Sequence, residues 1–172
     1  MFGNICTSSS GGFALARVIG ANTTPLEFED FMRNNPQYEI SDGGRCGWNI
    51  LHLSCSYLNV EMVEWLMAHP NKNDFINLCI SSYWAPIHIL FKNDGDEFKK
   101  LEILKLLIEN GANYDLSCRQ DGKTLNVLDL ALAKRNIECC KYLLSLDMKY
   151  DYEKIDFDLR SEIFTTVKAI DF

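Results

Sequence analysis

The feature that most constrains this chain is an internal repeat. Residues 48–52 (WNILH) and 84–88 (WAPIH) each place a histidine four positions after a tryptophan, and the two histidines are 36 residues apart. An apolar run follows each copy, centred near Leu66 and Leu107. A repeat of roughly 20–50 residues is typical of arrays in which each unit packs only on its neighbours. The chain is therefore expected to form stacked units.

A third copy of the pattern follows, with Asp129 in the place of the histidine and an apolar run that ends near Leu143. The histidine position and the leucine are 14 residues apart in the first and third copies, whereas His88 and Leu107 are 19 residues apart. The middle copy therefore carries an insertion, and we expect a solvated loop over Asn93–Lys99.

Short-range signals place helices in each copy. Asn49 and Asn126 favour helix N-caps, because a short side-chain amide accepts hydrogen bonds from free backbone N–H groups. Pro86 suits a first helical position, and Gly111 can take the left-handed conformation that ends a helix. Residues 24–27 (TPLE) form a capping box, which predicts a further helix near the N-terminus.

These residues resemble the ankyrin repeat. The most specific matches are Pro86–His88, Gly111–Ala112 and residues 121–124 (DGKT), and the resemblance spans roughly 43–152. It implies an all-α fold: an ankyrin-repeat solenoid of stacked helix pairs with short β-hairpin arms. Asn or Ala stands at positions where the family pattern has Thr, and Pro70–Asn71 replaces Gly-Ala.

We expect one ankyrin-repeat domain over residues 1–172. Its caps are a degenerate N-terminal repeat, with a helix near 13–18, and a C-terminal helix whose apolar stripe continues to Val167 and Ile170. The expected units are 11–42 (N-terminal capping repeat), 43–80, 81–117, 118–152 (repeats) and 153–172 (C-terminal cap helix).

Charge and cysteine usage exclude several classes of function. The net charge is −7, which disfavours nucleic acid as a partner. The chain shows neither a secretory signal nor an apolar run of about 20 residues that could span a membrane. The seven cysteines are odd in number and contain no Cys-x-x-Cys pair, so we expect reduced thiols in a cytoplasmic protein, with a nuclear one as the alternative.

One alternative is an enzyme in which His52 is the base and Cys55 the nucleophile, since residues three apart share a helical face. No orienting carboxylate or oxyanion hole accompanies the pair, and in ankyrin repeats this histidine is structural. The adjacent Cys139 and Cys140 point in different directions on a helix, so they are expected in the core and not on a metal. Neither a cofactor nor a metal is expected.

The candidate binding residues follow from the resemblance, which places them on the concave face of hairpins and inner helices. Trp48 and Trp84 occupy the same repeat position, and Lys123 is their equivalent in the third copy. Tryptophan and tyrosine are frequent binding hot spots, but both tryptophans could instead pack on neighbouring hairpins. The partner-binding set is Trp48, Ser56, Tyr57, Trp84, Lys92, Asn93, Lys123 and Lys134.

The function implied by the resemblance is non-catalytic protein–protein recognition, as an adaptor, inhibitor or scaffold. The expected partner is another protein, held in a groove with aromatic anchors and a basic rim, and the chain is expected to be monomeric. A regulatory array belonging to a larger polypeptide is a further alternative.

Overall fold

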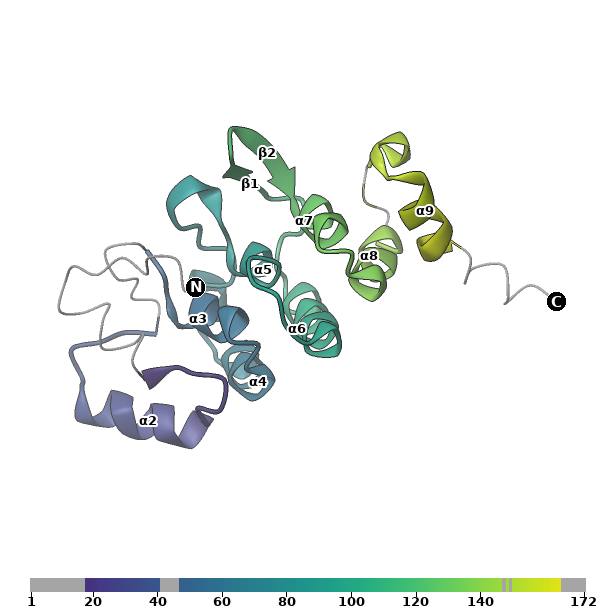
Figure 1. Cartoon of the computed structure of the whole chain (residues 1–172). Coiled ribbons are helices and arrows are strands. Elements are labelled where there is room, and N and C mark those ends of the chain that lie inside the picture. The colour runs from purple at the N-terminus through teal and green to yellow at the C-terminus, as the bar shows by residue number, and fades with distance from the viewer. Residues whose placement is uncertain (1–17, 41–46, 147, 149, 165–172) are drawn as a thin grey trace.

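Two layers of helices make up the centre of the molecule (Figure 1). The computed structural model describes residues 18–40, 47–146, 148 and 150–164. The inner layer consists of α3 (Ile50–Ser56), α5 (Pro86–Ile89) and α7 (Val127–Ala133). The outer layer consists of α4 (Val60–Ala68), α6 (Glu97–Glu109) and α8 (Ile137–Leu144). Within each layer α5 and α6 lie between their two neighbours, so each central helix contacts the helix before it and the helix after it.

A helix flanks this array at each end. At the N-terminal end α2 (Pro25–Asn34) contacts α4, and at the C-terminal end α9 (Phe157–Phe164) contacts α8. No helix among the described residues has the length and apolarity needed to cross a membrane. The predicted helix near 13–18, apart from Val18, and the predicted C-terminal positions Val167 and Ile170 lie outside the described residues.

The predicted helix starts are confirmed by their caps. The side chains of Asn49 and Asn126 accept hydrogen bonds from the backbone N–H groups of His52 at 3.0 Å and Asp129 at 2.9 Å. Pro86 is the first residue of α5. These contacts satisfy N–H groups that a helix leaves free in its first turn.

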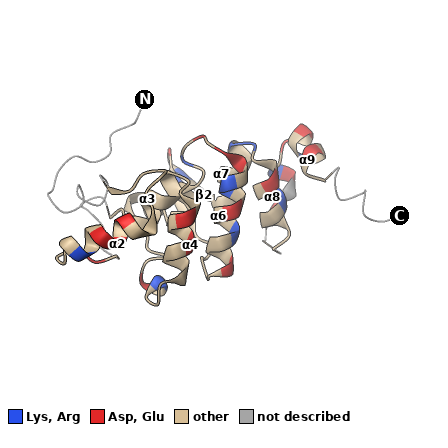
Figure 2. Ribbon diagram, turned by 90° about the horizontal axis from the view of Figure 1, so that it is seen from below, with Lys and Arg blue, Asp and Glu red and all other residues tan. Residues whose placement is uncertain are grey.

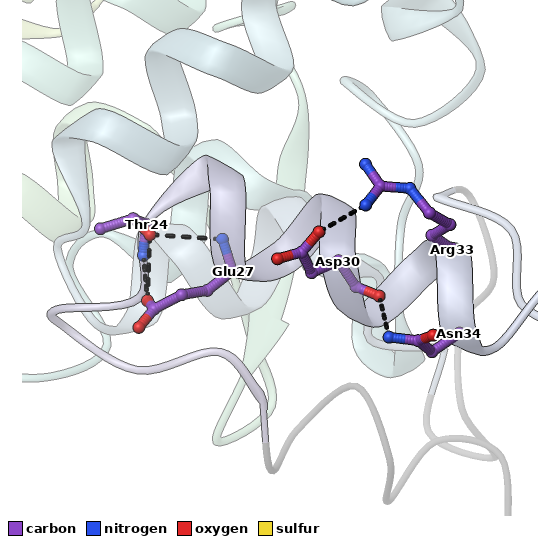
Figure 3. A network of polar contacts seen from close by, with 5 residues as sticks. All are labelled: Thr24, Glu27, Asp30, Arg33 and Asn34. Carbon is purple, nitrogen blue, oxygen red and sulfur yellow. Dashed lines mark hydrogen bonds and ion pairs between the residues drawn. The ribbon is translucent and has the colours of Figure 1, made fainter.

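Helix α2, at the N-terminal end of the array, is also capped by side-chain hydrogen bonds (Figure 3). Thr24 accepts from the N–H of Glu27, and the carboxylate of Glu27 accepts from the N–H of Thr24 at 2.9 Å. Arg33 pairs with Asp30 on the exposed side. Phe28 is fully buried, Phe31 and Met32 pack against the same core, and the indole N–H of Trp65 in α4 donates to Glu29 at 3.0 Å, so apolar and polar contacts both hold α2 on the array.

The predicted core positions of the three copies are confirmed as buried. Leu66, Leu107 and Leu143, which the sequence places at equivalent positions, are all completely buried. Cys139 and Cys140 are buried beside them, as predicted for small apolar side chains. Charged residues of both signs lie along the exposed side of α6 (Figure 2).

A β-hairpin is formed at one linker. Strands β1 (Ser117–Gln120) and β2 (Lys123–Asn126) pair antiparallel. The two-residue turn uses Asp121 and Gly122 with φ values of 50° and 76°, the left-handed pair that matches the twist of a hairpin. The predicted arm at this position is therefore present.

The resemblance predicts a β-hairpin arm between α4 and α5, but the structure, which describes the whole of this linker, shows no strand in it. The linker contains turns and two 3₁₀ segments, η1 (Lys72–Asp74) and η2 (Ser81–Tyr83). Phe75 and Ile76 are buried in the hydrophobic core, and the ring of Phe75 lies 6.2 Å from that of His69. This core packing outweighs their preference for strands.

The predicted insertion Asn93–Lys99 is only partly a loop. Helix α6 begins at Glu97, and the side chain of Asp96 caps it by accepting from Phe98 and Lys99. The buried Lys100 donates to the carbonyl oxygen of Asn93 at 2.9 Å. Residues 97–99 therefore extend α6, and the preceding loop is fastened to that helix.

Candidate functional site

Two histidines fasten the inner layer to the linkers. Nε2 of His52 lies 3.3 Å from the carbonyl oxygen of Trp84, and Nε2 of His88 lies 3.0 Å from that of Leu116. Nδ1 of His88 accepts from the N–H of Ala85, so its Nε2 is the nitrogen that donates. The histidines therefore act as structural ties, as the resemblance implied.

In the third copy a hydrogen bond between two side chains replaces the histidine–carbonyl hydrogen bond. Asp129 occupies the histidine position, and its carboxylate accepts a hydrogen bond from the hydroxyl of Tyr150 at 2.8 Å. Burial, this hydrogen bond and the negative charge of Asp129 all raise the pKa of Tyr150, so the phenol stays protonated and donates. The connection between an inner helix and the next linker is preserved with different chemistry.

The environment of Cys55 is unsuited to a nucleophile. Its side chain is completely buried, and burial raises the pKa of the thiol far above its ordinary value. Burial also lowers the pKa of His52 to about 4, which leaves the imidazole neutral. Among the described residues no hydrogen bond joins the two side chains. The geometry therefore gives no support to the Cys55–His52 enzyme alternative.

Three of the predicted binding residues meet at one place, which we call the tryptophan–lysine stack: Trp48, Lys92 and Trp84. The ammonium nitrogen of Lys92 lies 5.1 Å from the centre of the Trp48 ring and 5.7 Å from that of Trp84. Both distances are within the range of cation–π attraction. The stack therefore joins two neighbouring repeat copies on the inner side of the array.

The two tryptophans differ in exposure. Trp84 is only 9% exposed, and its indole N–H donates to the carbonyl oxygen of Arg119 in β1 at 3.2 Å. Trp48 is half-buried, and Lys92 is exposed. Trp84 therefore supports the hairpin, in line with the packing alternative, while Trp48 and Lys92 keep surface that a partner can reach.

A shallow pocket of about 350 Å³ lies next to the stack, between the hairpin and the inner helices. We call it the lysine pocket, and it is lined by Trp84, Phe91, Lys92, Gln120, Leu130, Ala133 and Lys134. Phe91 and Leu130 are buried apolar side chains, whereas both lysines are exposed. The lysine pocket thus combines an apolar base with two cations.

One wall of the pocket carries an ion pair between the second and third copies. Nζ of Lys134, at the end of α7, lies 2.7 Å from a carboxylate oxygen of Asp94. The hydrogen bond and the charge of Lys134 lower the pKa of Asp94. Asp94 is 93% exposed, so solvent screens most of this attraction.

The remaining predicted residues are distributed around this site. The amide of Asn93 donates to the hydroxyl of Ser56 at 3.2 Å, which joins the first copy to the loop before α6. Lys123 is exposed on β2, opposite the pocket residue Gln120. Tyr57 is the C-cap residue that follows α3 and is half-buried; in the described part of the chain no hydrogen bond or ring contact links it to the stack.

Several surface residues were missed by the sequence analysis. Gln120 lines the lysine pocket, and Arg119 lies 5.4 Å from the ring of Tyr83, which is 57% exposed. The Asp-Gly turn at residues 121–122 could have indicated Arg119 and Gln120, because residues beside a two-residue turn lie near the tip of a hairpin.

Comparison with known families gives one match. A family model for three copies of ankyrin repeats matches residues 28–117, which is more than half of the chain. This span includes α3 to α6 and both tryptophans of the stack, and it ends at the first residue of β1. No curated protein sequence matches the chain.

Proposed function

Because the chain belongs to the ankyrin repeat family, we propose that it is a non-catalytic protein–protein recognition module. We further propose that the helix pairs form an ankyrin solenoid whose repeats span 43–80, 81–117 and 118–152, between a capping repeat at 11–42 and a cap helix within 153–172. Ankyrin repeats are generally protein-binding modules, and burial raises the pKa of Cys55, the thiol that the enzyme alternative needs as its nucleophile. Its role is that of an adaptor, inhibitor or scaffold.

The observation that carries this proposal is the tryptophan–lysine stack. Lys92 is exposed and its ammonium group lies within cation–π distance of both indoles, so its charge is presented at a defined place. A fixed side chain loses less conformational entropy on binding than a free one, and aromatic residues provide large rigid contact areas. The stack is therefore suited to be the centre of the interface.

The surrounding residues provide the rim of the same interface. Lys134 lines the lysine pocket, Lys123 is exposed on the neighbouring hairpin, and Asn93 and Ser56 continue the surface toward α3. Charged rim residues mainly accelerate encounter, while the central aromatic residues slow dissociation. We place the module in the cytoplasm, with the nucleus as the alternative, because the described cysteines are unpaired thiols.

The test uses the full chain as bait in an extract of its source cells. The variant Lys92→Glu should abolish recovery of the specific partner while lowering the melting temperature only slightly, because a cation–π attraction at an exposed side chain contributes only about 0.5–1 kcal/mol. The matched control is Lys105→Glu, which makes the same charge change on α6 of the outer layer. The proposal is wrong if the partner is recovered equally with Lys92→Glu, or if both variants lose it.

A further inference from the structure

The ion pair at the lysine pocket is formed by a carboxylate on a loop. Asp94 precedes α6, follows the short helix α5, and reaches Lys134 at a position 40 residues further along the chain. Its side chain remains 93% exposed, so the contact with Lys134 covers little of it. Exposed ion pairs are weak, and this carboxylate can therefore be replaced by another one.

The second lysine of the pocket has no carboxylate partner among the described residues. The ammonium group of Lys92 contacts the faces of Trp48 and Trp84, which attract it but leave hydrogen-bond donors toward solvent. The apolar side chains Phe91 and Leu130 line the same pocket as the two lysines. The pocket therefore offers two cations beside an apolar base.

We propose that the lysine pocket binds an Asp or Glu side chain of the partner together with an adjacent apolar side chain, and that Asp94 acts as an internal competitor for Lys134. This proposal rests on the proposed function, because it specifies the chemistry that the same surface recognises. In the free protein Asp94 forms an ion pair with Lys134, one of the two pocket lysines. On binding, the partner's carboxylate takes its place and also reaches Lys92.

Three observations favour a carboxylate over other ligands. Asp94 itself shows that a carboxylate fits against Lys134 at hydrogen-bond distance. A cationic ligand would compete with Lys92 for the two indole rings and would be repelled by its charge. The net charge of −7 repels extended polyanions, so a local acidic group on a peptide is the better match.

The experiment selects ligands from a displayed library of random peptides against the purified full chain. The best selected peptide is then synthesised, and its affinity is measured by fluorescence anisotropy for the wild type, Asp94→Asn, Lys134→Gln and the control Glu102→Gln. Glu102 is exposed on α6, so the control removes the same charge away from the pocket. Melting curves establish that each variant is folded.

The selected peptides should carry an Asp or Glu beside an apolar residue. Asp94→Asn should bind the peptide about two- to fivefold more tightly, because a competing exposed ion pair is gone. Lys134→Gln should bind at least about tenfold more weakly, since a charge-assisted hydrogen bond is lost. Glu102→Gln should match the wild type.

The proposal is overturned if no peptide is enriched or if the selected peptides lack acidic residues. It is equally overturned if a second synthetic peptide, in which Asn or Gln replaces the selected Asp or Glu, binds as tightly as the first. It is also overturned if Asp94→Asn binds no better than Glu102→Gln. The bait experiment with Lys92→Glu tests the proposed function independently of these results. If the peptide experiment fails but Lys92→Glu still loses the partner, the surface binds a protein without using a carboxylate. If Lys92→Glu keeps the partner, the proposed function itself is wrong.

Discussion

Two residues of the described chain hold unusual backbone conformations at equivalent turns. Leu58 joins α3 to α4 and Arg135 joins α7 to α8, and both have a φ of 52°. Side chains with a Cβ resist this left-handed region, whereas glycine adopts it freely. The turn geometry is therefore imposed by the packing of the helix pair on residues that do not favour it.

We expect Arg135→Gly to be more stable than Arg135→Ala by about 1 kcal/mol, because both variants remove the exposed pair with Glu162 and differ only in the strain at the turn. Urea unfolding measures the difference. At Glu102, inside α6, the Ala variant should instead be more stable than the Gly variant by a similar amount, because alanine favours a helix and glycine does not. Equal stability of the two Arg135 variants would contradict the account of strain.

The buried histidine His52 makes stability depend on pH. Burial lowers its pKa from 6.5 to about 4, so between these values the unfolded chain binds more protons than the folded one. Stability is therefore complete above pH 6.5 and is lost as the pH falls toward 4. From pH 7 to 5 the loss from this group is about 2 kcal/mol, measured by denaturant unfolding at each pH.

The control for this dependence is His52→Gln, which retains a side-chain N–H donor but does not titrate. Its stability should change less than that of the wild type between pH 7 and 5. The remaining change belongs to other groups, including His88, whose pKa is also lowered by burial. An identical pH profile for the two proteins would show that His52 is not buried as a neutral group.

At the scale of helices, two neighbouring leucines of α6 test whether its buried face is the one that the repeat comparison predicts. Leu107 is completely buried between the layers, whereas its neighbour Leu106 is half-buried. Leu107→Ala should destabilise the protein by about 2–5 kcal/mol, because it removes buried atoms and leaves a cavity. Leu106→Ala should destabilise it clearly less. Comparable effects in thermal or urea melts would place α6 in a different register.

The elements differ in how well their sequences predict them. The helix pairs follow from Asn caps, Pro86 and apolar periodicity, all of which act over a few residues. The linker at Phe75 and Ile76 does not, because burial beneath the linker decides its shape. The start of α6 was also missed: the Asp96 cap is a local signal, but the offset between copies suggested a loop.

At the scale of the whole molecule, the site depends on contacts between copies. The resemblance placed Trp48, Trp84 and Lys92 on one face. It did not predict that Lys92 lies within cation–π distance of both indoles, nor that Asp94 pairs with Lys134. These contacts depend on the separation and rotation of neighbouring units, which residue spacing does not specify. The difference in burial between Trp48 and Trp84 has the same origin.

The stacked arrangement also determines how far a local change spreads. In such an array each unit contacts only its neighbours, so stability is approximately a sum over units and their interfaces. Helix α9 contacts α8, and its Leu159 and Ile163 are buried there. Ile163→Ala should therefore weaken the C-terminal end by about 2–5 kcal/mol while leaving α3 and α4 nearly unaffected.

Amide hydrogen exchange resolved by position measures this difference. In Ile163→Ala the amides of α8 should exchange faster, and those of α3 should keep their wild-type rates, because the units between them remain packed. Leu66→Ala, at the buried position of α4, is the matched variant and should give the opposite pattern. A uniform loss of protection in both variants would show that the array unfolds as one unit, without separable ends.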